Sequence, residues 1–172
     1  MTFILYDEIY EESTLSQYKH YSNAVDWVKE ESTANRYMHS LKDFYPDPNI
    51  MLKKYVASLP HTEKICLEKG FKDQQGFSID AKLAKYLPGN YFDWHCDDWV
   101  YNYNLPTARR ILTSITYLND DYIGGETEFS NGLVITPESG KTLVFPSFWA
   151  FPHKGREIVE GEKLILVMHV WA

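Results

Sequence analysis

Cysteine, basic charge and long apolar runs are all scarce in this chain. Its 172 residues contain two cysteines, Cys66 and Cys96. That number is too small for a disulfide framework and favours a reducing compartment. Lys and Arg total 17 against 24 Asp and Glu, giving a formal net charge of −7. A general nucleic-acid binder needs a basic surface, so we expect no nucleic-acid partner.

Segments that would attach the chain to a membrane are also missing. No stretch reaches the length of an apolar transmembrane helix. The apolar run at residues 3–6 is too short for a secretory signal and no basic segment precedes it. We therefore expect no membrane contact and a cytoplasmic location. Without an internal repeat, low-complexity tract or linker, residues 1–172 are expected to form one domain, as a monomer or weak dimer.

Apolar and aromatic residues are plentiful, at 44% and 16% of the chain, which indicates a folded globule. Roughly residues 1–70 have helical character after a short strand at residues 3–6. We predict helices at residues 22–31 and 49–58, and Pro48 is well placed to open the second.

From about residue 76 onward the pattern changes to short alternating runs bounded by Gly, Pro, Asn or Asp. Alternation of this kind is typical of strands. About eight strands at even spacing predict a mostly β (α+β) fold with a jelly-roll core over residues 76–172, with the helices packed on one face. Seven of them can be placed, at residues 76–87, 91–95, 109–118, 126–129, 133–136, 141–145 and 163–171.

The sequence around residues 86–97 ends in a His-x-Asp pair, His95 and Asp97. Residues two apart in a strand share a face, so the imidazole and the carboxylate should point the same way. Such pairs are common at surfaces and carry little information alone. With one more ligand they would form the two-His, one-carboxylate site that suits non-haem Fe(II).

Two histidines in the strand-rich part are candidates for the third ligand. His153 lies between a strand and a turn, 58 positions after His95, and a jelly roll pairs strands this far apart in sequence. His169 lies within the last predicted strand, where a hydrogen-bonded core histidine is the better interpretation. Lys163 begins that strand on an apolar face, so it either reaches water or awaits an anionic ligand.

Taken together, these features resemble the Fe(II)/2-oxoglutarate-dependent oxygenases, specifically their prolyl 4-hydroxylase-like branch. The resemblance covers roughly residues 78–172, and its segments follow the family's order. They are Tyr86-x-x-Gly89 before His95-x-Asp97, residues 113–119, residues 124–129, residues 139–145, and Pro152-His153 followed by Lys163.

The resemblance implies a double-stranded β-helix, a variant of the jelly roll, in which His95, Asp97 and His153 bind Fe(II). The iron would be chelated by the cosubstrate 2-oxoglutarate. The implied activity is a dioxygenase that uses O₂ to hydroxylate a C–H bond and releases succinate and CO₂. Ascorbate is a candidate reductant.

The resemblance also implies how the far carboxylate of 2-oxoglutarate is held. Lys163 would pair with it, helped by a hydroxyl from Tyr86 or Tyr117. Thr113 lies on the same face as Tyr117 and is expected to line the same pocket.

The substrate is less defined than the reaction. A prolyl residue in a peptide or protein is favoured, and a free amino acid or other small molecule stays open. Trp94, Trp99, Tyr101 and Tyr103 are either an aromatic groove for the substrate or a packed loop, and residues 98–108 are a lid or a surface loop. A jelly-roll binding module without catalysis and a cupin-type metal enzyme are the rival functions.

Overall fold

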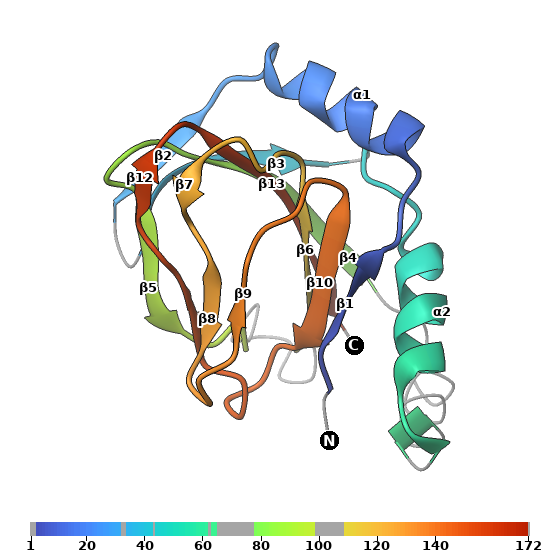
Figure 1. The fold of residues 1–172 in the computed structure, drawn as a ribbon. Coiled ribbons are helices and arrows are strands. Elements are labelled where there is room, and N and C mark those ends of the chain that lie inside the picture. The colour runs from blue at the N-terminus through green and yellow to red at the C-terminus, as the bar shows by residue number, and fades with distance from the viewer. Residues whose placement is uncertain are drawn as a thin grey trace, which may run out of the picture.

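A computed structural model describes residues 3–31, 34–42, 44–61, 63–64, 78–98 and 109–171. Two helices and a series of short strands follow one another through these ranges (Figure 1). The helices are α1 (Glu12–Ser22) and α2 (Pro48–Ser58). The strands are β1 (Leu5–Glu8), β2 (Val28–Glu31), β3 (Ala34–Leu41), β4 (Ser78–Tyr86), β5 (Tyr91–His95), β6 (Arg110–Tyr117), β7 (Ile123–Gly124), β8 (Thr127–Phe129), β9 (Val134–Ile135), β10 (Lys141–Pro146), β11 (His153–Gly155), β12 (Ile158–Glu160) and β13 (Lys163–Trp171).

The strands form one large antiparallel sheet that curls around an interior. Its order is β1-β10-β6-β13-β4-β3-β5-β11-β8-β9, with β2 paired to β3, while β12 and β7 make a separate pair. Strands far apart in the sequence are neighbours, as in β6 beside β13. In Figure 1, β5, β8 and β9 lie on one side of the interior and β10, β6 and β4 lie on the other. This curled sheet is the predicted jelly roll.

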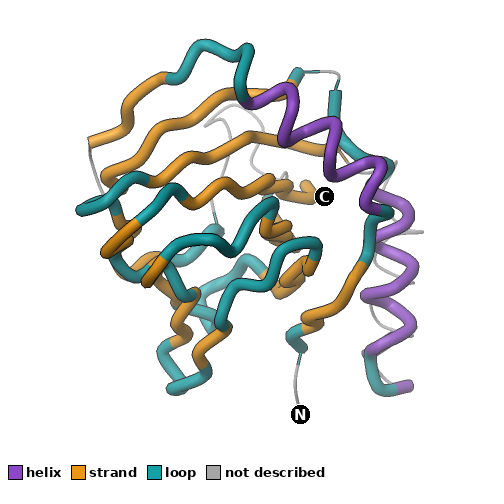
Figure 2. Tube along the Cα trace, turned by 45° about the horizontal axis from the view of Figure 1, so that its top comes forward, coloured by secondary structure: helices purple, strands orange, loops and turns teal. Residues whose placement is uncertain are grey.

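Both helices lie outside the strands and cover one face of the sheet (Figure 2). Leu15 and Tyr18 of α1 and Met51 and Tyr55 of α2 belong to one apolar core with the outward side chains of β4, β6 and β13. The predicted helical cover is therefore confirmed. Each helix has 11 residues, and no helix in the described ranges is long and apolar enough to cross a bilayer.

Strand β13 is central and buried on both faces, as its sequence predicts. It pairs with β4 on one side and β6 on the other. One set of alternate residues packs under the helices, and the other set faces the interior of the curled sheet. The outer set is Leu164, Leu166, Met168 and Val170; the inner set is Lys163, Ile165, Val167 and His169.

The helix predicted at residues 22–31 is wrong. Helix α1 ends at Ser22, where the backbone N–H groups of Asn23 and Ala24 donate to the carbonyl oxygens of His20 and Tyr21, respectively. Residues 28–31 are strand β2, which pairs antiparallel with β3. Cross-strand pairing decides the structure of this segment over its helix-like apolar spacing, since strand formation depends strongly on such neighbours. The first third of the chain thus adds three strands to the sheet.

The helix predicted at residues 49–58 is confirmed. Pro48 occupies its first turn, and the side chain of Asp47 accepts a hydrogen bond from the backbone N–H of Asn49. Such a cap supplies a partner for one of the free donors at a helix start. Met51, Leu52 and Tyr55 form its buried face, whereas Ile50 is exposed.

Replacing Leu166 by alanine tests the helix–sheet core. Leu166 is fully buried between the sheet and the helices, so the shortened side chain would leave a cavity. We expect the free energy of unfolding to fall by about 2–5 kcal/mol, measured by urea denaturation. Val159→Ala is the control, since Val159 is 67% exposed. Equal small effects in both variants would contradict this packing.

Candidate active site

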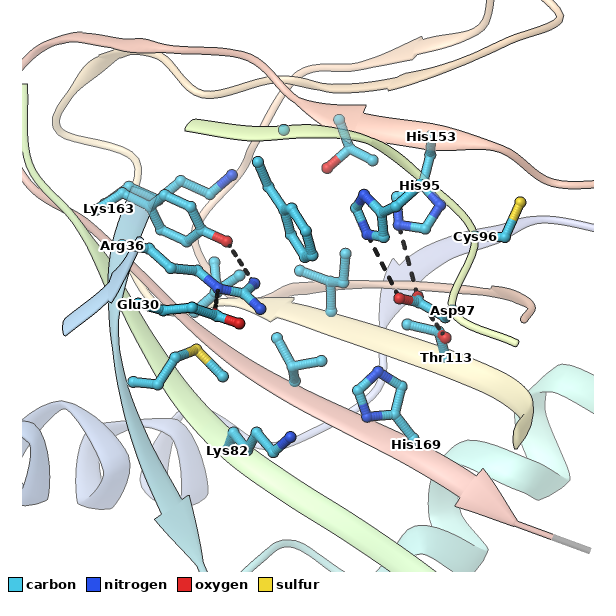
Figure 3. A pocket seen from close by; sticks show the side chains of 18 of the residues that line it. Glu30, Arg36, Lys82, His95, Cys96, Asp97, Thr113, His153, Lys163 and His169 are labelled. Carbon is cyan, nitrogen blue, oxygen red and sulfur yellow. Dashed lines mark hydrogen bonds and ion pairs between the residues drawn. The ribbon is translucent and has the colours of Figure 1, made fainter. Parts of the chain in front are cut away.

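Three potential metal ligands meet on the inner face of the curled sheet. His95 ends β5, Asp97 follows two residues later, and His153 begins β11. Strands β5 and β11 are antiparallel partners, and their register places His153 opposite His95. One ligand atom from each of the three residues lies within 4.8 Å of the others. Figure 3 shows both imidazoles turned toward the Asp97 carboxylate, an arrangement that fits a single metal ion.

Backbone carbonyls fix both imidazoles in an orientation that suits metal binding. His95 Nδ1 lies 2.6 Å from the carbonyl oxygen of Asp93, and His153 Nδ1 lies 3.1 Å from that of Phe151. A carbonyl can only accept, so each Nδ1 carries the proton and donates it. Each Nε2 is left with a lone pair, and lies 3.4 Å (His95) or 3.6 Å (His153) from an Asp97 oxygen. Outer hydrogen bonds of this kind orient metal-binding histidines.

A hydrogen bond from a neighbouring side chain also fixes the position of the Asp97 carboxylate. Thr113 Oγ1 donates to Asp97 Oδ2 at 2.8 Å and lies 2.9 Å from Ser147 Oγ. Burial alone would raise the pKa of Asp97, but interaction with His95 and His153 lowers that pKa well below its usual range. Burial lowers the pKa of His153 to about 4, against the opposing effect of Asp97. At neutral pH the pair therefore offers a carboxylate and a neutral imidazole, the forms that bind metals.

The cluster opens into a cavity of about 420 Å³ inside the curled sheet. Residues from both halves of the fold line it, including the inner side chains of β4, β6 and β13 and Phe92 of β5. Lys163 lies in the same cavity, on the side away from Asp97 in Figure 3. A metal site and a buried cation therefore share one enclosed space.

Lys163 has no carboxylate partner among the described residues. Its side chain is buried, and Nζ donates to the carbonyl oxygen of Gly125 at 2.5 Å. The ammonium also lies 5.3 Å from the Tyr86 ring centroid and 5.4 Å from that of Tyr117. Burial lowers the pKa of Lys163 to about 7, although Glu126 acts to raise it. An amine in this setting fits an anionic ligand, which would restore its charge.

The two tyrosines predicted beside Lys163 differ in their access to the cavity. Tyr86 lines it, and its hydroxyl accepts a hydrogen bond from Arg36 at 2.8 Å. Tyr117 is fully buried behind the wall, with its hydroxyl 2.8 Å from Thr127 Oγ1. Thr127 does line the cavity. Tyr86 and Thr127 are thus the hydroxyl-bearing side chains that a ligand near Lys163 can reach directly.

Sequence reasoning missed Arg36 and Thr127. Arg36 lies on β3, in the part expected to be helical, so no inward face was assigned to it. Its guanidinium stacks 4.0 Å from the Phe92 ring centroid and donates to Glu30 at 2.8 Å. Thr127 stands within the quoted segment 124–129, two positions before Phe129, so alternation from that buried residue could have found it.

His169 is buried, as the sequence suggested, and its nearest charged partner is Asp80, with an oxygen 3.7 Å from Nδ1. It lines the cavity, and its Nδ1 has no hydrogen-bond partner within the described part of the chain. It also stands apart from the three-residue metal cluster.

The predicted aromatic group near the site is only partly visible. Trp94 is 44% exposed, with Lys154 Nζ 4.8 Å from its ring centroid, and it does not line the cavity. Trp99, Tyr101 and Tyr103, most of the predicted loop 98–108, and Cys66 lie outside the described residues. Cys96 is a free thiol.

Comparison with known proteins gives a family for this arrangement. A sequence model of the 2OG-Fe(II) oxygenase superfamily matches residues 81–171. The chain belongs to that superfamily. A "Putative prolyl 4-hydroxylase" from Acanthamoeba polyphaga mimivirus is 29% identical over 125 residues, covering 62% of this chain and 49% of the mimivirus protein. The match thus spans about half of that relative's length.

Solved structures share the fold of this chain. A viral collagen prolyl hydroxylase from Paramecium Bursaria Chlorella virus-1 has a TM-score of 0.71 at 20% identity, over 99% of this chain and 97% of the viral one. A Pseudomonas putida prolyl-4-hydroxylase has a TM-score of 0.67 at 16% identity, over 97% and 91% of the two chains. At such identities the likeness is one of fold, and it confirms the predicted jelly-roll architecture.

Replacing Asp97 by alanine tests the metal cluster. The variant loses the anionic ligand and leaves two neutral imidazoles, so we expect loss of stoichiometric Fe(II) or Zn(II) binding in anaerobic calorimetry. Asp93→Ala is the matched control, because Asp93 lies four residues earlier in β5 with its side chain exposed. Full metal binding by the Asp97 variant would contradict the assignment.

Affinity for 2-oxoglutarate should depend on pH through Lys163. The free amine has a pKa of about 7, and a bound carboxylate favours the ammonium form, so binding takes up a proton above pH 7. We expect the Kd to rise by up to about tenfold per pH unit above that point. Lys163→Arg stays charged throughout and should give a flatter profile. The same slope in both proteins would assign the pH effect to another group.

Proposed function

We propose that the protein is an Fe(II)- and 2-oxoglutarate-dependent dioxygenase that hydroxylates a prolyl residue in a peptide or protein, releasing succinate and CO₂. One observation carries the proposal: the cluster of His95, Asp97 and His153 shares its cavity with Lys163, a buried lysine that has no carboxylate partner among the residues that the structure describes. Either feature alone occurs in many folds. Both in one cavity meet the needs of a metal and a dicarboxylate together.

The donor set fits iron by its chemistry. Two imidazoles and one carboxylate leave coordination positions open, which is the pattern of non-haem Fe(II) oxygenases. When bound, the iron and 2-oxoglutarate together supply the oxidising chemistry that O₂ alone cannot perform on a C–H bond. His95, Asp97 and His153 would hold the metal, and the carbonyls of Asp93 and Phe151 keep both imidazoles in place.

Lys163 would bind the far carboxylate of 2-oxoglutarate. Tyr86 and Thr127 offer hydroxyl groups on the same side of the cavity. Thr113 would act on the metal side, because its hydroxyl donates to Asp97. The apolar side chains that line part of the cavity lower the local polarity, which strengthens these charged contacts.

The choice of a prolyl substrate rests on relatives. The mimivirus relative is named a "Putative prolyl 4-hydroxylase", and the structurally similar proteins from the Chlorella virus and P. putida are named prolyl hydroxylases. A prolyl hydroxylase from Trichoplax adhaerens, solved with a peptide fragment of hypoxia inducible factor, shares the fold at a TM-score of 0.62. These names support a prolyl substrate for this chain.

Anaerobic addition of Fe(II) and then 2-oxoglutarate tests the chemistry. We expect a weak visible charge-transfer band that needs both additions and is absent in His153→Ala. Lys163→Ala should need at least about tenfold more 2-oxoglutarate for the same band, given the strength of a charge-assisted hydrogen bond. Lys154→Ala, a surface lysine paired with Glu128, is the control.

Two results would contradict the proposal. A folded protein that binds Fe(II) without any band on adding 2-oxoglutarate would favour the jelly-roll binding module. The other result is a band together with a mass gain of one oxygen in a free amino acid but in no prolyl peptide. That result would support the dioxygenase chemistry but contradict the prolyl substrate.

A further inference from the structure

Basic side chains gather at one end of the cavity, away from Lys163. Lys82 of β4, Arg110 of β6 and His169 of β13 all line it. In Figure 3, Lys82 and His169 lie on the side of the cavity opposite Lys163. All three side chains lie near one carboxylate oxygen of Asp80. That oxygen is 2.9 Å from Arg110 Nη2, 3.3 Å from Lys82 Nζ and 3.7 Å from His169 Nδ1.

Strand register places this basic group beside the metal cluster. His169 pairs across the sheet with Asp80 on one side and with Thr113 on the other. Cross-strand partners have adjacent side chains on one face of the sheet. Thr113 in turn donates to Asp97. A ligand held by His169 would therefore lie next to the metal ligands.

The hydrogen-bonding capacity of the group exceeds what Asp80 can satisfy. His169 Nδ1 and Arg110 Nε are shielded and have no hydrogen-bond partner among the described residues. His169 Nε2 forms no hydrogen bond within the described residues, and it becomes a donor when an anion in the cavity favours the imidazolium form. Buried donors left without acceptors are costly. The group therefore has donors to spare for a ligand.

The charges of the groups in the cavity indicate whether that ligand is an anion or a cation. Arg36 is matched by Glu30. The formal charges of a bound divalent metal, Asp97, bound 2-oxoglutarate and protonated Lys163 would add up to zero. Lys82 and Arg110 face the single carboxylate of Asp80, so one positive charge is left over. An excess of positive charge attracts anions, and a singly charged anion would balance it.

We infer that the substrate carries a carboxylate, and that Lys82, Arg110 and His169 bind it beside the metal. The inference rests on the proposed oxygenase function and narrows its substrate class. For a prolyl substrate, the carboxylate next to the reacting ring belongs to free proline or to a prolyl residue at a peptide C-terminus. An internal prolyl residue has a neutral amide at that place.

Paired ligands test this inference without catalysis. Zn(II)-loaded protein saturated with 2-oxoglutarate is titrated by calorimetry with L-proline against L-prolinamide, and with N-acetyl-glycyl-L-proline against its C-terminal amide. We expect each carboxylate to bind at least about tenfold more tightly than its amide, the usual effect of a charge-assisted contact. The tighter of the two acids identifies the source, free proline or a peptide terminus.

Variants locate the subsite. Lys82→Gln and His169→Leu should each lower the affinity for the carboxylate ligands by about tenfold, with the affinity for 2-oxoglutarate within about twofold of wild type. Lys85→Gln is the matched control: Lys85 lies on the same strand, with its ammonium 4.5 Å from the Trp27 ring centroid, outside the cavity. Circular dichroism and the retained 2-oxoglutarate affinity show that each variant is folded.

The outcomes separate this inference from the proposed function. Equal affinity for acid and amide, no binding of either, or equal effects of Lys82→Gln and Lys85→Gln would overturn the carboxylate subsite. Loss of 2-oxoglutarate binding by the wild-type metal-loaded protein would overturn the oxygenase function instead. In that case the acid–amide comparison on the metal-loaded protein still decides whether the basic group binds carboxylates.

Discussion

The register between β5 and β11 is the constraint on which the active site depends. It sets His153 opposite His95, and Asp97 follows directly on the end of β5. A one-residue slip in an antiparallel pair would turn every side chain of one strand to the other face. The pairing of β11 with β8, where His153 lies opposite Phe129, holds this register from the second side. The ligands are thus positioned by backbone hydrogen bonds, which β11 makes on both of its edges.

The outer face of the sheet mainly stabilises the fold, and the inner face carries the candidate active site. The outer face is almost wholly apolar and is covered by α1 and α2, whereas the inner face mixes apolar residues with charged ones. Strand β13 contributes to both, since its outer residues pack under the helices and its inner residues line the cavity. Burying Lys163 and His169 is unfavourable by itself. The continuous apolar core on the opposite face stabilises the strand that carries them.

Sequence reasoning works best where alternation, turns and motifs agree. The seven predicted strands, the same-face placement of the candidate ligands His95 and Asp97, and the inward face of β13 follow from period-two patterns. Strands β7, β11 and β12 are not predicted, because each has only two or three residues and shows no such pattern. Sequence reasoning also fails at β2 and β3, because a short apolar run with Trp27 and Val28 fits helix and strand alike until the pairing partner is known. Arg36 is missed for the same reason. The cluster around Asp80 is missed because its members come from three strands whose adjacency no local pattern reveals.

Lys163 and the basic group around Asp80 lie at different places in the cavity. This separation would let the cavity bind two anions at distinct positions. Lys163 stands alone against two tyrosine rings and a carbonyl, a setting with little competing negative charge and room for one carboxylate. At the other end Asp80 already holds Arg110 and Lys82 in place, so a ligand there meets a pre-ordered group of donors. Preorganised donors lose less entropy on binding than mobile ones. The metal cluster lies beside the basic group around Asp80. The end of the cavity at which an anion binds therefore determines which atoms of the anion face the metal.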